Sequence, residues 1–87
     1  MKLIRKLRWD RSGLIPAAVV DHETKRLLVL CFLDQEALRL TLETGQVHTY
    51  SRSRKRVALK GESSGHVQTV RRILVNCNQN SLCIEVE

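Results

Sequence analysis

The sequence is poor in aromatic residues and in proline. One Phe, one Trp and one Tyr make up 3% of its 87 residues, beside one Pro and four Gly. A chain this short buries only about 60% of its unfolded surface, and with few aromatic side chains its core must be aliphatic and thin. The composition excludes a multidomain enzyme with its own deep cleft and predicts support from a partner chain or a metal. It also leaves few rings on which single-stranded nucleic acid can stack.

Cysteine and long apolar runs are scarce as well. The three cysteines, Cys31, Cys77 and Cys83, form no framework of paired disulfides and lack the close spacing of a zinc knuckle, and we expect Cys31 and Cys83 to be small buried hydrophobes. No run approaches the roughly 18 apolar residues that span a bilayer, and the basic N-terminus does not resemble a signal peptide. We therefore expect one cytoplasmic domain over residues 1–87, without disulfides and without a membrane partner.

Acidic residues are outnumbered, with 9 against 15 basic residues and a formal net charge of +6. This excess predicts anionic partners such as nucleotides, phosphates or nucleic acid, without choosing among them. Two stretches hold ten of the basic residues, and we name them the basic arm (Lys2, Arg5, Lys6, Arg8 and Arg11) and the basic strip (Arg52, Arg54, Lys55, Arg56 and Lys60).

Hydrophobic patterning predicts a mostly β fold with one short helix. Apolar, β-branched runs at residues 14–21 and 27–32 are separated by a short polar segment, which indicates a hairpin. A helix is expected to begin at Gln35, with Asp34 as its N-cap and Gly45 ending it, and to place Leu38, Thr41 and Leu42 on one face. Further strands are expected at residues 47–51 and 82–86. We expect small antiparallel sheets in a homodimer, with or without strand exchange, because a thin core needs support from a second chain.

Serine and arginine alternate in Ser51-Arg52-Ser53-Arg54. In an extended segment, both serines would lie on one face and both arginines on the other. Hydroxyls and guanidinium groups are suited to a phosphate, because arginine donates two parallel hydrogen bonds to adjacent oxygens. The segment is therefore a candidate phosphate site, and the alternative is a solvated basic strand.

Two further segments carry candidate residues. The small-residue loop from Gly61 to His66 is interpreted either as a loop whose backbone amides approach a ligand or as an ordinary turn. His48 and His66 are interpreted either as ligands or proton carriers or as structural residues. In Asn76-Cys77-Asn78-Gln79-Asn80, alternating oxygen donors stand beside a thiol. Neutral amides bind a hard cation poorly, so an asparagine-rich turn is the alternative to a metal site there.

Several of these segments together resemble the phosphoribosyl-AMP cyclohydrolase family. The blocks that carry the resemblance, in chain order, are Gly13–Ala17, Leu33–Leu38, Thr44–His48, Tyr50–Arg56 and Lys60–Gln68. An ordered set of blocks is far more specific than any one of them, and the resemblance extends from about Trp9 to Val86.

The resemblance implies an enzyme of histidine biosynthesis that adds water across the bond between N1 and C6 of the adenine ring of phosphoribosyl-AMP. It also implies a zinc-dependent, magnesium-binding homodimer whose intertwined subunits share the active site, in which zinc would activate a water molecule. The positions that the resemblance assigns to substrate and phosphate binding are Ser51, Arg52, Ser53, Arg54, Lys60, Glu62, Ser64 and His66.

The sequence also departs from the family pattern. The family has Asp-Cys-Asp-x-Asp where this chain has Asn76, Asn78 and Asn80 around Cys77, so one zinc position is kept and the magnesium positions are amides. The family's next motif, Cys-His-Thr-Gly and a further Cys, would lie beyond Glu87, and its Arg-Leu-Trp is Arg56-Val57-Ala58 here. We therefore expect zinc and magnesium not to be retained and cyclohydrolase activity to be absent or very low. The alternatives are a module that binds a nucleotide or nucleic acid and a dimerising domain whose site is a relic.

Overall fold

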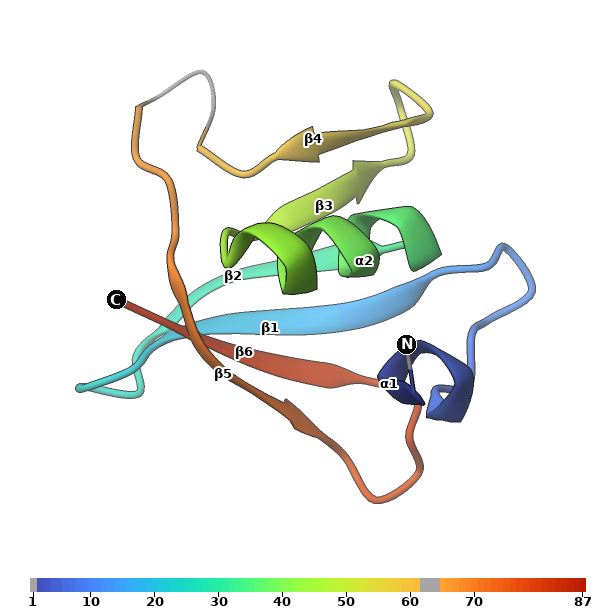
Figure 1. Ribbon diagram of the computed structural model, residues 1–87, viewed down its shortest axis with the longest axis horizontal. Coiled ribbons are helices and arrows are strands. Elements are labelled where there is room, and N and C mark those ends of the chain that lie inside the picture. The colour runs from blue at the N-terminus through green and yellow to red at the C-terminus, as the bar shows by residue number, and fades with distance from the viewer. Residues whose placement is uncertain (1, 62–64) are drawn as a thin grey trace.

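A computed structural model describes residues 2–61 and 65–87 of the chain. The element order is α1 (Lys2–Lys6), β1 (Ile15–Asp21), β2 (Leu27–Leu33), α2 (Gln35–Thr44), β3 (His48–Ser51), β4 (Arg56–Leu59), β5 (Val70–Val75) and β6 (Leu82–Val86) (Figure 1). The mostly β fold is confirmed, but the described residues form two helices rather than one. The additional helix, α1, lies in the basic arm, where no apolar pattern had indicated it.

A four-stranded sheet in the order β2-β1-β6-β5 forms the body of the molecule. Strands β1 and β2 form the predicted antiparallel hairpin, and β5 and β6 also pair antiparallel. Between them, β1 and β6 run parallel, with Ala17 opposite Leu82 and Val19 opposite Ile84, so the expectation of purely antiparallel sheets was wrong. Alternating apolar residues on both strands point to the same face in this register, which buries them together.

Helix α2 covers this face of the sheet. It begins where the Asp34 carboxylate accepts a hydrogen bond from the Ala37 N–H at 2.7 Å, and it ends at Gly45 with φ of 73°. Both predicted caps are therefore confirmed. The helix buries Ala37, Leu38 and Thr41, whereas Leu42 is 36% exposed. Of the three residues expected on one face, Leu38 and Thr41 therefore pack in the core and Leu42 lies at its margin.

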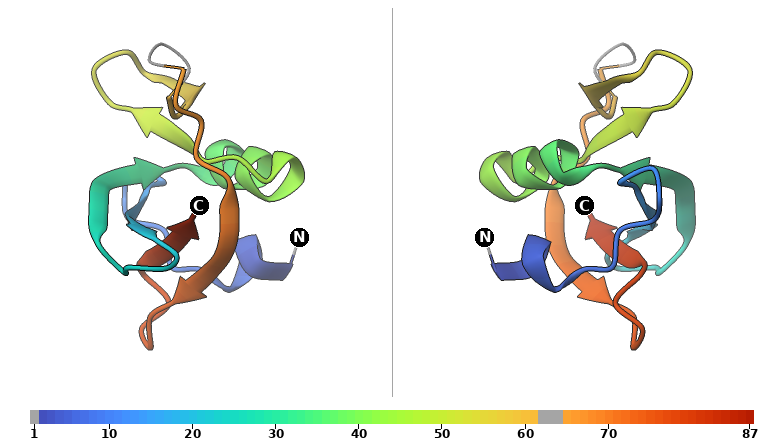
Figure 2. Two further views of the ribbon diagram at one scale, coloured as in Figure 1. Left: turned by 90° about the vertical axis from the view of Figure 1, so that its left-hand side faces the viewer. Right: turned by 90° about the vertical axis from the view of Figure 1, so that its right-hand side faces the viewer.

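Strands β3 and β4 form a separate hairpin that projects from the main sheet (Figure 2). The Thr41 hydroxyl accepts a hydrogen bond from the His48 N–H at 2.9 Å, which joins the start of β3 to α2. Val47 is fully buried, its N–H donates to the Gln68 carbonyl at 3.0 Å, and its carbonyl accepts from the Lys60 N–H at 2.8 Å. The base of the hairpin is thus fixed to the body of the domain, while its tip extends outward.

Apolar side chains remain exposed on the outer strands. On β2 they are Leu27, Leu28 and Leu30, of which Leu30 is 71% exposed, and on β5 they are Leu74 and Val75. Dimer formation and strand exchange stay predictions, which these exposed residues motivate. Neither helix in residues 2–61 and 65–87 is long and apolar enough to cross a membrane.

Candidate phosphate-binding site

The main groove lies between β2 and the β3–β4 hairpin and has a volume of about 550 Å³. Its polar lining comes from Thr49, Arg54, Lys60, His66 and Gln68, while aliphatic side chains of β2 and β4 complete its walls. Two cationic side chains, Arg54 and Lys60, therefore face a partly apolar hollow. The structure brings together Arg54, Lys60 and His66 from the predicted site, as the phosphate hypothesis requires.

The basic strip is not extended at its start. Residues 52–55 form the turn between β3 and β4, and Lys55 has a positive φ of 53°. The Ser51 and Ser53 hydroxyls lie 3.2 Å apart, and the Arg54 N–H donates to the Ser51 hydroxyl at 3.3 Å. The predicted alternation across an extended strand was therefore wrong, because the hairpin reverses there and the serines close its turn.

Arg52 and Arg54 have different surroundings. The Arg52 guanidinium lies 4.1 Å from the centre of the Phe32 ring on β2, a cation–π distance. Arg54 lines the groove, whereas Arg52, Ser51 and Ser53 are not among its lining residues. Of the four residues in the predicted phosphate motif, Arg54 is the one that the groove includes.

The loop after β4 is closed tightly at its base. Gly61 has φ of +87°, and a Cβ at this position would lie 2.0 Å from the His66 carbonyl oxygen. The Gly65 N–H donates to the Gly61 carbonyl at 2.8 Å. Glycine is therefore required at residue 61 both for its backbone angle and for this close approach. Glu62 and Ser64 lie outside the described residues, so their predicted roles stay predictions.

Gln68 and Thr49 line the groove but were missed by sequence reasoning. The Oε1 atom of Gln68 is buried and has no hydrogen-bond partner within the part of the chain that the structure describes. An unpaired buried amide oxygen is costly, which marks Gln68 as a candidate contact for a hydrogen-bond donor on a ligand. The sequence signal for Gln68 was its place at the end of the Lys60–Gln68 block. Its burial could not be predicted, because that depends on the tertiary fold.

The predicted metal positions lie far from this groove. Asn76, Cys77, Asn78 and Asn80 belong to the turn between β5 and β6, at the opposite end of the molecule from the β3–β4 hairpin in both orientations (Figures 1 and 2). Cys77 is exposed, and residues 2–61 and 65–87 contain no group of three or more His, Cys, Asp or Glu side chains that could hold a metal. One thiol and neutral amides do not fit zinc or magnesium.

The other two cysteines are partly buried, as their interpretation as small hydrophobes anticipated. Cys31 and Cys83 have intermediate exposure. Burial raises the pKa of the Cys31 thiol to about 11, so the thiol stays protonated at neutral pH. Cys31 is therefore not a candidate nucleophile or metal ligand.

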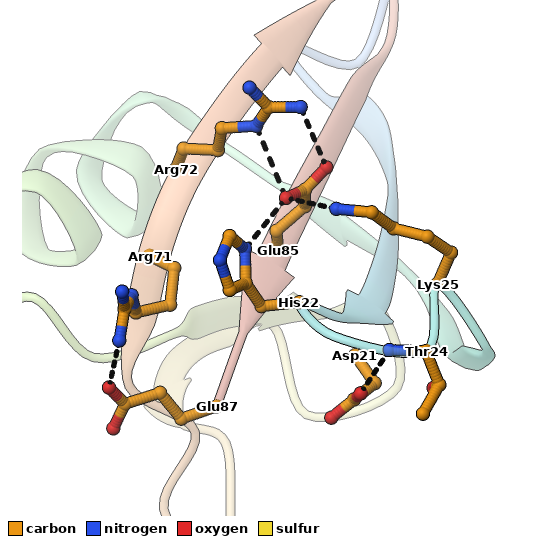
Figure 3. Close-up of polar contacts among 8 residues, drawn as sticks. All are labelled: Asp21, His22, Thr24, Lys25, Arg71, Arg72, Glu85 and Glu87. Carbon is orange, nitrogen blue, oxygen red and sulfur yellow. Dashed lines mark hydrogen bonds and ion pairs between the residues drawn. The ribbon is translucent and has the colours of Figure 1, made fainter.

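A second polar cluster surrounds Glu85 on β6 (Figure 3). The Glu85 side chain is only 4% exposed, and its Oε1 lies 2.9 Å from Lys25 Nζ, 3.0 Å from His22 Nδ1 and 3.1 Å from Arg72 Nε. Hydrogen bonds from Lys25, His22 and Arg72, in that order of importance, lower the pKa of Glu85 to about 2 against the opposing effect of burial. This cluster ties the β1–β2 turn to β5 and β6 and was not anticipated from sequence, because its members come from three separate segments.

The fold and the groove together define a small β domain with a groove lined by two cationic side chains. A family model, phosphoribosyl-AMP cyclohydrolase, matches residues 29–87. The chain is 49% identical over 81 residues to the phosphoribosyl-AMP cyclohydrolase of Methanoregula boonei, covering 93% of this chain and 66% of that protein. It is 45% identical over 84 residues to the histidine biosynthesis bifunctional protein HisIE of Caldanaerobacter subterraneus, covering 97% and 41%.

The chain belongs to the phosphoribosyl-AMP cyclohydrolase family. A third relative, the phosphoribosyl-AMP cyclohydrolase of Sinorhizobium medicae, is 51% identical over 79 residues, which cover 91% of this chain and 52% of that protein. The chain thus spans between about two fifths and two thirds of the length of these three relatives. The resemblance first inferred from ordered sequence blocks is confirmed.

Proposed function

We propose that this chain carries the nucleotide-binding groove of a phosphoribosyl-AMP cyclohydrolase and acts in the hydrolytic opening of the adenine ring during histidine biosynthesis. The observation that carries the proposal is the placement of Arg54 and Lys60 in one groove of a chain that belongs to this family. A cytoplasmic location is part of the same proposal.

The groove suits a nucleotide better than a bare anion because its polar groups are of two kinds. Phosphate oxygens accept hydrogen bonds, so Arg54 and Lys60 are their natural partners. The Gln68 side-chain oxygen, which has no partner among residues 2–61 and 65–87, would accept a hydrogen bond from a ribose hydroxyl or a base amino group. We therefore orient the ligand with a phosphate at Arg54 and Lys60 and its sugar or base toward Gln68.

Ring opening requires water to attack C6 while the bond between C6 and N1 breaks. The described residues account for substrate binding and charge, and the zinc and magnesium that the resemblance implies remain proposals. The prediction of absent or very low activity has no support from the relatives, and of its grounds the described residues bear only on the donor set of the Cys77 turn.

A homodimer is the proposed assembly. Leu27, Leu28 and Leu30 on β2, with Leu74 and Val75 on β5, leave apolar surface exposed that a second copy would cover. Within one chain, the β3–β4 hairpin, which lines the groove, and the β5–β6 turn, which contains Cys77, lie at opposite ends (Figure 1). A site that used both would therefore draw its residues from two copies.

The nucleic-acid alternative gains no support from the arrangement of the basic residues. The basic arm includes α1 and Arg8. The backbone N–H of Arg8 donates to the Gln79 carbonyl in the β5–β6 turn at 2.7 Å. The basic strip lies at the other end of the molecule (Figure 2). The two stretches thus do not form one continuous track for a phosphate backbone, and we propose no nucleic-acid partner.

Isothermal titration calorimetry with inorganic phosphate and with AMP tests the groove. Arg54→Ala should weaken both by about 10-fold or more, because a charged hydrogen-bonding group is lost. Arg52→Ala is the matched control and should change both affinities by less than about twofold, since Arg52 lies against Phe32. Equal effects of the two variants, or no binding of either ligand by the wild type, would contradict the proposed site. Turnover of phosphoribosyl-AMP by the purified chain measures activity separately.

A further inference from the structure

The turn from Asn76 to Asn80 is held by its own side chains. The Asn76 side-chain oxygen accepts hydrogen bonds from the Asn80 N–H at 2.9 Å and the Ser81 N–H at 3.0 Å. The Asn76 amide nitrogen donates to the Asn80 side-chain oxygen at 2.6 Å. The Gln79 N–H donates to the Asn76 carbonyl at 3.0 Å, and Gln79 adopts a positive φ of 60°. Asn76 therefore links the two ends of the turn through both atoms of its amide.

The contact between the Asn76 and Asn80 side chains depends on their being amides. An amide presents a donor and an acceptor, so two of them can pair directly. Two carboxylates at the same separation would present only acceptors and like charges, and they would repel unless a cation lay between them. The hydrogen bonds from the Asn80 and Ser81 N–H groups to Asn76 do not require an amide, because a carboxylate oxygen would accept them equally well.

We propose that the Asn76–Asn80 amide pair closes the β5–β6 turn without a metal ion, in the place where carboxylates would need a divalent cation. The turn of this chain is therefore self-contained, and its stability does not depend on magnesium or calcium. This inference concerns the chain's own turn and stands whether or not the groove binds a nucleotide.

The thermal unfolding midpoint, measured in EDTA and across a series of MgCl₂ and CaCl₂ concentrations at constant ionic strength, tests the proposal. The wild-type Tm should be the same in all of these conditions. The double variant Asn76→Asp with Asn80→Asp should lose about 4–8 °C in EDTA, the range expected for one net interaction in a domain of this size. It should regain that loss as either cation is added, because a ligand that binds only the folded state raises the midpoint.

The double variant Asn78→Asp with Gln79→Glu is the matched control. It adds the same two charges to the same turn, but among the described residues neither Asn78 nor Gln79 contributes a side-chain hydrogen bond, so the amide pair stays intact. Its Tm should fall by less than that of the first double variant and should respond less to cations. An equal loss and an equal recovery in both variants would assign the effect to charge alone and overturn the proposal.

Asn80→Ala removes the acceptor of the amide pair without adding charge, so it remains informative if the double Asp variant does not fold. It should lower the Tm in EDTA, and added cations should not restore it. Two results would overturn the proposal: a wild-type Tm that rises saturably with magnesium or calcium, or an Asn80→Ala protein as stable as the wild type.

Discussion

The central strands and the β3–β4 hairpin differ in how they are held. In β1 and β6, alternate residues such as Ile15, Val19 and Ile84 are fully buried, and each strand has a neighbour on both sides. The hairpin contains strands of only four residues with no fully buried side chain, yet it contributes Arg54 to the groove. The buried sheet therefore provides most of the stability. The proposed ligand-binding side chain Arg54 lies on a lightly packed hairpin that is held in place by the body of the domain.

Truncating a buried side chain at the centre of the sheet should cause the largest loss of stability. Ile84 is 0% exposed and lies opposite both Val19 and Ile73, so Ile84→Ala should lower the free energy of unfolding by about 2–5 kcal/mol through lost burial and a cavity. Urea unfolding followed by circular dichroism measures the loss. Leu42→Ala on α2 is the control and should cost much less, because Leu42 is 36% exposed. Equal losses would mean that the sheet is not the source of stability.

Substitution of Gly61 should have the next largest effect and should act on the groove. In Gly61→Ala, the backbone cost of a positive φ is about 1–2 kcal/mol, and the clash with the His66 carbonyl adds to it. Gly45→Ala is the control, since Gly45 also has a positive φ but no atom within 4 Å of the added Cβ. Calorimetric titration with phosphate should show weaker binding for Gly61→Ala only. Unchanged affinity would show that the loop closure does not shape the groove.

Acid should produce the smallest of the three effects, and it should act on the sheet through Glu85. Because the folded-state pKa of Glu85 is lowered from 4.5 to about 2, its contribution is present above about pH 4.5 and is lost as pH falls toward 2. In Glu85→Gln, the decline of unfolding free energy between these pH values should be shallower than in the wild type. Glu87→Gln alters an exposed pair with Arg71 and should leave the decline nearly unchanged. Parallel pH profiles for all three proteins would contradict the assignment to Glu85.

Local chemistry explains which parts of the fold were predictable. The Asp34 and Gly45 caps, the β1–β2 hairpin and the strand at residues 82–86 depend on neighbouring residues, and these predictions were confirmed. The parallel pairing of β1 with β6 joins distant segments, so no local pattern could indicate it. The turn at residues 52–55 was missed because the Ser-Arg alternation resembles a strand until the reversal at Lys55 is known.

The candidate site was only partly predictable for the same reason. Arg54, Lys60 and His66 were identified from motif and charge, and the structure places them in one groove. Gln68 was missed because its side-chain oxygen is buried without a partner among the described residues, which only the packed chain reveals. The separation of Cys77 from the groove was likewise not predictable, because Cys77 closely follows the groove residue Gln68 in the sequence and only the tertiary fold places them apart.

The parallel pairing of β1 with β6 has a consequence for synthesis on the ribosome. β1 directly precedes β2 and can form its hairpin as soon as both have emerged, but its other edge has no partner until residues 82–86 emerge. Until then, a strand with unpaired backbone groups and an apolar face stays open to other nascent chains. Pairing between such distant segments also slows folding. Strand β6 is thus the one that covers the open edge of β1.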